Sequence, residues 1–175
     1  MSGVPFPPEL RLEPVRRDHR RQAFRSGEEP VDSWLARRAL QHQQKHLSAT
    51  KVLVHEQDNR IAGFYTLAMG QVDFGDLPVD VVKHLPRRNL PVAVLAWLGV
   101  DVRSQGLGLG TRLFAQALRD CYEAGKTFAF VAVILDCLND RAKSFYRKWD
   151  FEELPGHPYR LFLSAAQLAA LMEAK

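Results

Sequence analysis

The feature that most constrains the fold is a glycine-rich stretch in the second half of the 175-residue chain. It reads Gln105-Gly106-Leu107-Gly108-Leu109-Gly110 and follows an apolar run from Val92 to Val102. Apolar residues then recur at helical spacing, at Leu109, Leu113, Phe114, Ala117, Leu118 and Cys121. We therefore predict a buried strand that passes through a tight turn into a helix ending near Gly125.

The predicted turn has the chemistry of a phosphate-binding site. Glycine removes the side chains that would keep backbone N–H groups away from a ligand, and the first turn of a helix offers unpaired N–H donors and a positive dipole end. We expect a pyrophosphate to bind there. The lack of a Gly-Lys-Ser/Thr ending argues against a nucleoside triphosphate site, and no acidic ribose anchor follows about 20 residues later. A tight turn without a ligand is the alternative.

The rest of the chain predicts strands and helices mixed around one sheet. Before the glycine turn we expect a loose lead-in (1–9), an edge strand (10–15), a short helix or loop (16–24), a helix (31–47), a hairpin (51–55 and 60–68) and a long irregular connection (70–91). After it we expect a strand (128–135), a helix capped by Asn139, a strand (159–163) and a helix opened by a capping box at Ser164 and Gln167. This length favours one α/β domain over residues 1–175.

Composition limits the class of protein. No window approaches the roughly 18 apolar residues of a membrane helix, and there is no apolar signal-type stretch at the N-terminus, so we expect a cytoplasmic protein. Cys121 and Cys137 lack the C-x-x-C spacing of a redox or metal site, and we interpret both as core residues. His42 and His46 have the i, i+4 spacing of two metal ligands, but no third ligand is evident, so we expect partly exposed polar residues and no metal.

Positive charge flanks the glycine turn. Residues 83–119 contain a single acidic side chain, Asp101, beside six basic ones: Lys83, Arg87, Arg88, Arg103, Arg112 and Arg119. Such a face is either solvated and steers an anionic cofactor, or it binds a second substrate that is itself a polyanion such as RNA.

Two motifs in the same order resemble the acetyl-CoA site of the GCN5-related N-acetyltransferases (GNAT). The first is the glycine turn, and the second is Asn139-x-x-Ala142-x-x-Phe145-Tyr146. The resemblance implies the GNAT fold, a mixed α/β sheet with splayed central strands, and acetyl-CoA as the co-substrate. It implies backbone pairing of the pantetheine with Leu98, Val100 and Val102. The other cofactor-binding residues that it implies are Gln105, Gly106, Gly108, Leu109, Gly110, Thr111, Asn139 and Phe145.

A narrower resemblance covers about residues 10 to 165. The chain is similar to the acetyltransferase toxins of bacterial toxin–antitoxin pairs at several segments: 24–27, 31–35, 39–41, 61–67, 85–87, 98–101, 142–146 and 160–163. This implies the α-amine of aminoacyl-tRNA as acceptor and a ribbon-helix-helix antitoxin as partner, with a homodimer as a further expectation. The chain departs from the toxin pattern at Trp97, Arg88 and Asp150, which stand in place of an arginine, an aromatic residue and a cap glycine.

Tyr146 is the candidate catalytic residue. Amide formation from a thioester needs a proton for the leaving thiolate, and a phenol can supply it. The alternative is a core tyrosine with a satisfied hydroxyl. No general base is evident: Glu56, Asp73 and Asp101 are candidates, and each is as easily a surface or turn carboxylate. An α-amine titrates near 7.7 to 8.0, so part of it is already neutral and needs no base.

The acceptor leaves three functions open. For tRNA, we expect phosphate contacts from Arg87, Arg88, Arg37, Arg38 and Lys45, whose alternative is solvated surface. Tyr65 would line the acceptor channel, with packing in the strand core as its alternative. The other two functions are an acetyltransferase for a small amine or a protein N-terminus, and a non-catalytic acetyl-CoA-binding module.

Overall fold

The computed structural model describes residues 3–174, which divide into two compact units. Unit 1 contains residues up to 68 together with 96–119, and unit 2 contains residues 69–95 and those from 120 onward. Two long strands, β3 (Ile61–Asp73) and β4 (Asn89–Val100), run through both units. We describe each unit by itself, and the expectation of a single domain stays a prediction.

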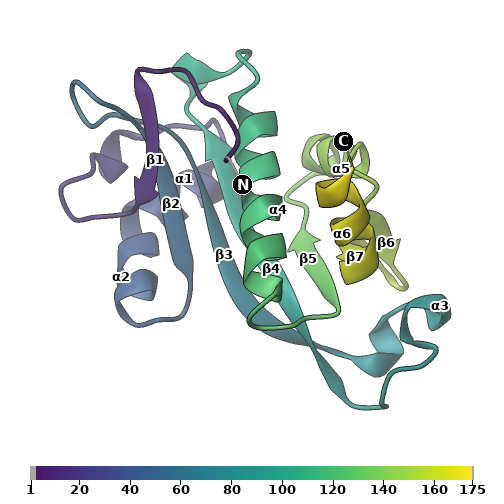
Figure 1. Ribbon diagram of the computed structural model, residues 1–175. Coiled ribbons are helices and arrows are strands. Elements are labelled where there is room, and N and C mark those ends of the chain that lie inside the picture. Colours follow the sequence, from purple (N-terminus) through teal and green to yellow (C-terminus); the bar gives the residue numbers. More distant parts are fainter. Residues whose placement is uncertain (1–2, 175) are drawn as a thin grey trace. The chain divides into compact units, whose positions relative to one another are not determined.

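The strands form one mixed sheet in the order β1-β2-β3-β4-β5-β7-β6 (Figure 1). The remaining strands are β1 (Leu10–Pro14), β2 (Ala49–His55), β5 (Ala132–Asp136), β6 (Glu152–Leu154) and β7 (His157–Ser164). β4 and β5 are parallel, with Val92 opposite Ala132, whereas β1 with β2, β2 with β3, and β7 with β5 and β6 are antiparallel. The mixed sheet and the edge position of β1 are confirmed.

Unit 1 carries its helices on the segments before β2 and after β4. They are the 3₁₀ turns η1 (Arg21–Ala23) and η3 (Val102–Ser104), the helices α1 (Glu29–Arg37) and α2 (Ala39–Gln44), and most of α4 (Leu109–Gly125). The prediction of one helix over 31–47 was wrong, because Arg38 leaves helical geometry at φ −121° and separates α1 from α2. The predicted end of α4 at Gly125 is confirmed.

Aromatic side chains organise the core of unit 1. Phe24 and Phe64 are buried and meet edge to face at 5.4 Å, and both belong to the same core cluster as the buried Leu35. Trp34 and Trp97 lie stacked at 5.4 Å against this cluster. Such aromatic pairs each add to the stabilisation that burial of their surface provides.

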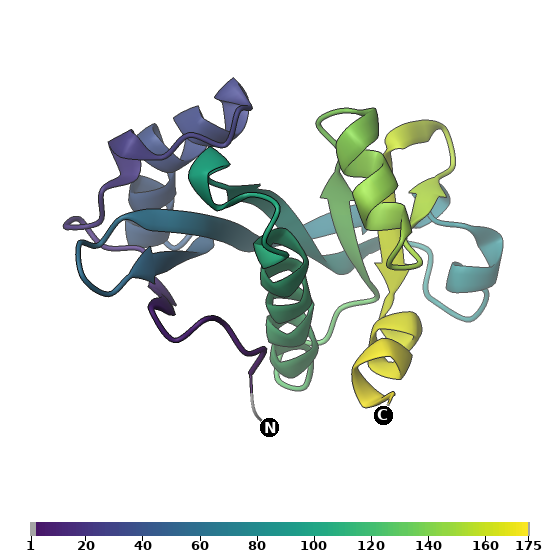
Figure 2. The same ribbon diagram turned by 90° about the horizontal axis from the view of Figure 1, so that it is seen from above.

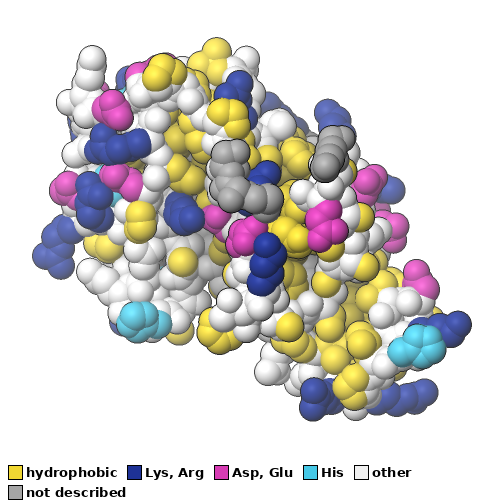
Figure 3. Space-filling model, in the orientation of Figure 1, with side chains coloured by type: hydrophobic (Ala, Val, Ile, Leu, Met, Phe, Trp, Pro, Cys, Tyr) yellow, Lys and Arg dark blue, Asp and Glu magenta, His cyan; other side chains and the backbone are white. Residues whose placement is uncertain are grey.

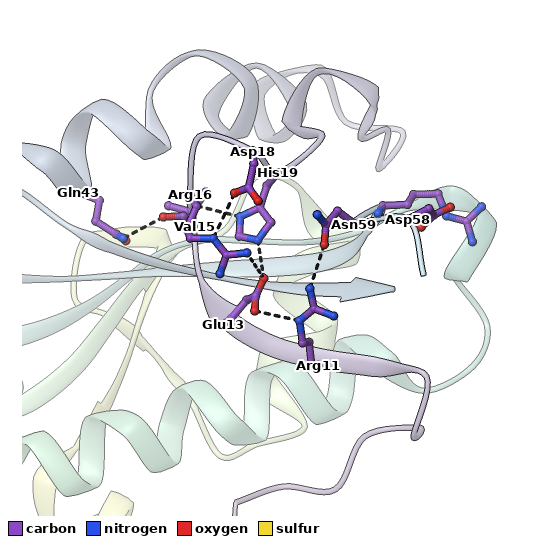
Figure 4. A network of polar contacts seen from close by, with 10 residues as sticks. Arg11, Glu13, Val15, Arg16, Asp18, His19, Gln43, Asp58 and Asn59 are labelled. Atoms are coloured by element: carbon purple, nitrogen blue, oxygen red, sulfur yellow. Dashed lines mark hydrogen bonds and ion pairs between the residues drawn. The ribbon is translucent and has the colours of Figure 1, made fainter. Parts of the chain in front are cut away.

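A polar network holds the edge strand β1 to the segment that follows it (Figure 4). Glu13 accepts hydrogen bonds from the side chains of Arg11 (2.9 Å) and His19 (2.6 Å), and pairs with Arg16 at 3.1 Å. The buried His19 ring also accepts the Arg16 backbone N–H at 2.8 Å. Burial alone would raise the pKa of Glu13, but these donors together lower it to about 2.

Unit 2 contains η2 (Phe74–Asp76), α3 (Val79–Val82), α5 (Asp140–Arg147) and α6 (Ala165–Glu173). The long irregular connection predicted over 70–91 was wrong at both ends, because β3 continues to Asp73 and β4 begins at Asn89. The segment between them buries Leu77 and Val82 in the core of this unit. The capping box of α6 is confirmed, whereas the short strand β6 was not predicted. Among residues 3–174, no helix is long and apolar enough to span a membrane.

Candidate functional site

The glycine turn in unit 1 has the predicted backbone geometry. Gly106 and Gly108 adopt φ values of +81° and +77°, a region in which a side chain is strained. A Cβ added to either glycine would meet no described atom within 4 Å, so the turn borders open space. Arg112 N–H donates to the Gly108 carbonyl at 3.2 Å, and the N–H groups just ahead of it, on Leu109, Gly110 and Thr111, lie at the helix N-terminus. These features fit a pyrophosphate.

The side chain of Gln105 bonds the start of the turn to neighbouring backbone. Its Nε2 atom donates to the carbonyl oxygens of Ser26 at 2.8 Å and Val100 at 2.9 Å. The Val102 N–H donates to the Arg25 carbonyl at 2.7 Å, which joins the same two segments a second time. The segment 25–26 therefore holds the start of the turn in place, and the side-chain amide of Gln105 is used within the protein.

Two buried carboxylates hold this segment. Asp32 accepts hydrogen bonds from the Ser26 N–H at 2.8 Å and its hydroxyl at 2.6 Å. Asp101 accepts from the backbone N–H groups of Arg25 (3.1 Å) and Arg103 (3.0 Å) and from the Arg103 guanidinium (3.0 Å). Burial would raise the pKa of Asp101, but these donors lower it below its usual value. These bonds favour the turn-carboxylate alternative over a general base for Asp101.

The strand that leads to the turn is shorter than predicted. β4 ends at Val100, and Val102 belongs to η3, where its N–H is already bonded to Arg25. The Val102 N–H is therefore not available to pantetheine, and the expected pairing with the Val102 backbone stays a prediction. Leu98 and Val100 do lie on β4, and the ladder between β4 and β5 includes no described residue of β4 after Leu95. Their backbone groups thus lie beyond the end of that ladder, as expected of splayed strands.

In unit 2, the second motif lies on α5 as predicted. Asn139 caps the helix by accepting the Ala142 N–H at 2.9 Å. Tyr146 is 9% exposed, and its ring meets that of Phe145 edge to face at 5.2 Å. Burial, with a smaller contribution from Cys137, raises the pKa of the Tyr146 hydroxyl above its usual value. The hydroxyl therefore stays protonated at neutral pH, which is the form that can donate a proton.

Neither cysteine offers a competing nucleophile. Both are free and buried, as predicted. Burial raises the pKa of the Cys121 thiol to about 12, and burial raises that of Cys137 to about 11 although Lys143 opposes the shift. Since the thiolate is the reactive form, both side chains are unreactive at neutral pH.

The predicted RNA-contacting residues are divided between the two units. In unit 1, Arg37, Arg38 and Lys45 are exposed at the ends of α1 and α2. In unit 2, Arg87 lies over the Phe74 ring at 5.7 Å, and Arg88 is exposed beside it in sequence.

Tyr65 is 1% exposed, which favours packing in the strand core over a place in an acceptor channel. Of the other candidate bases, Asp73 accepts the Gly75 N–H at 2.8 Å and Glu56 is an exposed side chain in the turn after β2.

The histidine pair does not form a helical metal site. His42 packs edge to face on Trp34 at 4.7 Å, whereas His46 lies beyond the end of α2 with φ +60°. Within the described range 3–174, no group of three His, Cys, Asp or Glu side chains is placed to hold a metal ion.

Two departures from the toxin pattern have structural reasons. Trp97 stacks on Trp34, whose indole N–H donates to the Thr66 hydroxyl at 3.1 Å, so position 97 serves the core of unit 1. Asp150 takes φ +67°, so it makes the left-handed turn that a cap glycine would make.

The supporting role of Ser26 and Asp32 was not predicted from the sequence. Their bonds join residues far apart in the chain, such as Gln105 and Ser26. The sequence feature that pointed to these two residues was their place in segments 24–27 and 31–35, which resemble the acetyltransferase toxins.

The chain matches the model of the Acetyltransferase (GNAT) family over residues 13–151. It is 35% identical, over 86% of its length and 89% of the relative's, to a tRNA-acetylating toxin of Mycobacterium tuberculosis (strain ATCC 25618 / H37Rv). Its structure is similar to that of a tyrosine-to-phenylalanine mutant of KacT (TM-score 0.86, 26% identity, covering 93% of this chain and 99% of that one). It is also similar to AtaT complexed with acetyl-methionyl-tRNAfMet (TM-score 0.85, 24% identity, with the same coverage). The chain therefore belongs to the GNAT family of acetyltransferases.

Proposed function

We propose that this protein transfers the acetyl group of acetyl-CoA to the α-amine of aminoacyl-tRNA. The observation that carries the proposal is the similarity to a tRNA-acetylating toxin, which extends over 86% of the chain and includes both motifs. The geometry supports the same chemistry, because the open glycine turn suits a pyrophosphate and the buried phenol of Tyr146 suits a proton donor. We propose that neither the Val102 N–H nor the Gln105 side chain contacts acetyl-CoA. The residues that we propose to contact it, at Val102 and Gln105 through their other atoms, are Leu98, Val100, Val102, Gln105, Gly106, Gly108, Leu109, Gly110, Thr111, Asn139 and Phe145.

Tyr146 is proposed to carry a proton between the two reacting groups. The new C–N bond forms as the amine attacks the thioester carbonyl, and the C–S bond breaks. The amine loses one proton and the leaving thiolate gains one, so no proton is consumed overall. A phenol with a raised pKa is a weaker acid than the thiol in water, so Tyr146 must donate to sulfur while it receives the proton from nitrogen.

The lack of an evident general base favours an α-amine as the acceptor. Among the carboxylates considered, Asp101 and Asp73 hold backbone N–H groups and Glu56 is exposed. A lysine side chain, with a pKa near 10.4, would need such a base, whereas an α-amine near 7.7 to 8.0 does not. This difference favours an α-amine, of which aminoacyl-tRNA carries one.

The partners are proposed from the same resemblance. We propose a ribbon-helix-helix antitoxin that inhibits the enzyme, a homodimer as the assembled form, and the cytoplasm as the place of action. Basic side chains at Arg37, Arg38, Lys45, Arg87 and Arg88 are proposed to contact tRNA phosphates.

The test is transfer of radiolabelled acetyl from acetyl-CoA to bulk charged tRNA. We expect label on aminoacyl-tRNA, and we expect the Tyr146→Phe variant to lower kcat by about 10²- to 10⁴-fold with acetyl-CoA affinity unchanged. Uncharged tRNA is the control, since it has no α-amine. Label that appears only on a small amine or a peptide N-terminus would replace the tRNA proposal. Acetyl-CoA binding with no transfer to any of these acceptors would support the non-catalytic module.

A further inference from the structure

Two tryptophan side chains of unit 1 form a stacked pair that is only partly buried. Trp34 of α1 and Trp97 of β4 have ring centroids 5.4 Å apart and planes 13° from parallel. His42 of α2 meets the Trp34 ring edge to face at 4.7 Å. Both tryptophans pack against the core cluster of unit 1, yet each keeps part of its side chain exposed. The two indoles therefore form an aromatic platform at the surface of this unit.

The Trp34 indole is fixed in place and has no donor left for a ligand. Its N–H donates to the Thr66 hydroxyl at 3.1 Å, and the Thr66 and Thr50 hydroxyl oxygens lie 2.7 Å apart. Both threonines are buried, so bonds inside the unit set the orientation of the ring. The surface that Trp34 leaves exposed is apolar, which suits an apolar ligand and offers a charged group no hydrogen bond.

The platform lies on the face of β4 opposite to α4. Side chains alternate along a strand, so Trp97 shares a face with Gly99, and a Cβ added to Gly99 would lie 2.7 Å from Val31 of α1. Val100 points to the other face, where its Cγ2 atom lies 3.6 Å from a Cβ added to Gly110 in the first turn of α4. Figure 2 shows the same division, with α1 and α2 on one side of the unit 1 strands and α4 on the other.

Position 97 is next to the expected place of the thioester. The pyrophosphate is expected at the glycine turn, and the pantetheine is expected to pair with Val100 and then with Leu98, which leaves the thioester end near Leu98. Trp97 precedes Leu98 on β4, two residues past Leu95, where the described ladder with β5 stops. Since the cofactor is held on the α4 side, the acceptor amine has the α1 face for its approach. Its own side chain then lies against the platform.

We propose that the aromatic platform binds the side chain of the amino acid that is acetylated, and that it favours aromatic and large aliphatic groups over charged ones. The inference deepens the proposed function and rests on it for the acceptor. Contact with the indoles removes apolar surface of the acceptor from water, and an aromatic acceptor gains ring contacts in addition. Trp97 stands where the toxin pattern has an arginine, so the apolar character of this position belongs to this chain.

Charged acceptors are the competing class, and the platform suits them less. A carboxylate would lose hydration and find no donor on Trp34, whose N–H bonds to Thr66. A guanidinium can lie over an indole face, but the exposed Arg37 and Arg38 follow Trp34 at helical spacing and repel a second cation. Surface charge elsewhere gives little basis for a choice, because Lys and Arg are interspersed with Asp and Glu on the face that Figure 3 shows.

The test uses one tRNA body charged in turn with phenylalanine, leucine, glutamate or arginine, so that the nucleic acid is constant. The kcat/KM for acetyl transfer to each is measured for the wild type, Trp97→Leu and Trp97→Arg. Phe128→Arg is the matched control, because Phe128 is an aromatic side chain that is 70% exposed and lies outside both motifs. Thermal unfolding and calorimetric titration with acetyl-CoA establish that each variant is folded and binds the cofactor.

We expect the wild type to prefer the phenylalanyl and leucyl acceptors about tenfold to a hundredfold over the charged ones. Trp97→Leu should keep that preference but lower the ratio of phenylalanyl to leucyl transfer about three- to tenfold, because one ring contact is lost. Trp97→Arg should lower the ratio of leucyl to glutamyl transfer about tenfold or more, since it replaces an apolar surface with a cation. Phe128→Arg should leave all of these ratios unchanged.

Equal kcat/KM for the four acceptors in the wild type would overturn the proposal. So would an equal loss for all four in both Trp97 variants, which would mean that Trp97 stacks on a terminal nucleobase or only supports the fold. If Trp97→Arg does not fold, the ratio of phenylalanyl to leucyl transfer in Trp97→Leu decides the question. Wild-type enzyme that acetylates none of the four charged tRNAs would instead overturn the proposed function.

Discussion

At the scale of single residues, Glu13 shows how one carboxylate can make the fold sensitive to acid. Its pKa of about 2 lies below the ordinary glutamate value, because His19, Arg11 and Arg16 stabilise its charged form. A lowered folded-state pKa contributes stability that is present above the unfolded-state value near 4.5 and is lost as the pH falls toward 2.

The Glu13→Gln variant should therefore lose stability at neutral pH. We expect a decrease of at most about 3 kcal/mol in the free energy of unfolding at pH 7, which disappears between pH 4.5 and pH 2. Urea denaturation at pH 7, 4 and 3 measures the difference. Glu9→Gln is the control, because Glu9 is exposed and bonds through its backbone carbonyl. A difference that is constant with pH would contradict this account.

At the scale of elements, the turn after α5 uses a non-glycine residue where glycine is favoured. Asp150 has φ +67°, and in the described chain its side chain makes no hydrogen bond or ion pair that glycine would remove. We expect Asp150→Gly to stabilise the protein by about 0.5–1 kcal/mol. Lys148→Gly, at φ −64° two residues earlier, should destabilise it by a similar amount. Thermal unfolding of both variants compares the two, and a loss of stability in Asp150→Gly would argue against strain at this turn.

The glycines of unit 1 differ in what an added Cβ would meet. A Cβ on Gly63 would lie 2.6 Å from Leu113 Cδ1 and 3.0 Å from the Gly99 carbonyl oxygen, whereas a Cβ on Gly108 would meet only open space. We expect Gly63→Ala to lower stability by about 1–3 kcal/mol. Gly108→Ala should weaken acetyl-CoA binding about tenfold or more with a smaller loss of stability, because its methyl would enter the space that we propose for the pyrophosphate.

Calorimetric titration with acetyl-CoA and thermal unfolding of the two glycine variants separate these effects. Gly108→Ala with wild-type affinity for acetyl-CoA would remove the glycine turn from the proposed site. Gly63→Ala with wild-type stability would mean that the neighbouring backbone moves to accept the methyl group.

At the scale of the whole molecule, the strands β3 and β4 each contribute residues to both units. Unfolding of one unit would therefore disrupt strands that the other unit contains. We therefore expect one cooperative unfolding transition. Trp34 and Trp97 report on unit 1 and Trp149 on unit 2. A Trp149→Phe variant and a Trp34→Phe/Trp97→Phe variant should each unfold with the same midpoint by tryptophan fluorescence as by circular dichroism. Separate midpoints for the two probes would show that the units unfold independently.

Local patterns predicted the elements whose cause is local. The glycine turn, the Asn139 cap and the capping box at Ser164 depend on residues within one or two turns of each other, and all three form as predicted. The helix over 31–47 was wrong because its apolar spacing continues through Arg38, where the backbone nonetheless leaves the helix. The connection over 70–91 was wrong at both ends, because β3 continues to Asp73 and β4 begins at Asn89.

The sequence by itself determined three features: a glycine-rich turn ahead of a helix, a phenol on a capped helix, and membership of the GNAT family. Each follows from residue types at short spacing, which is what a linear pattern contains. Only the tertiary structure decided that Gln105 bonds to Ser26, that Tyr65 is buried, and that Trp34 and Trp97 stack. These relations join distant parts of the chain, so they depend on how α1, α2 and β4 pack and not on any local repeat.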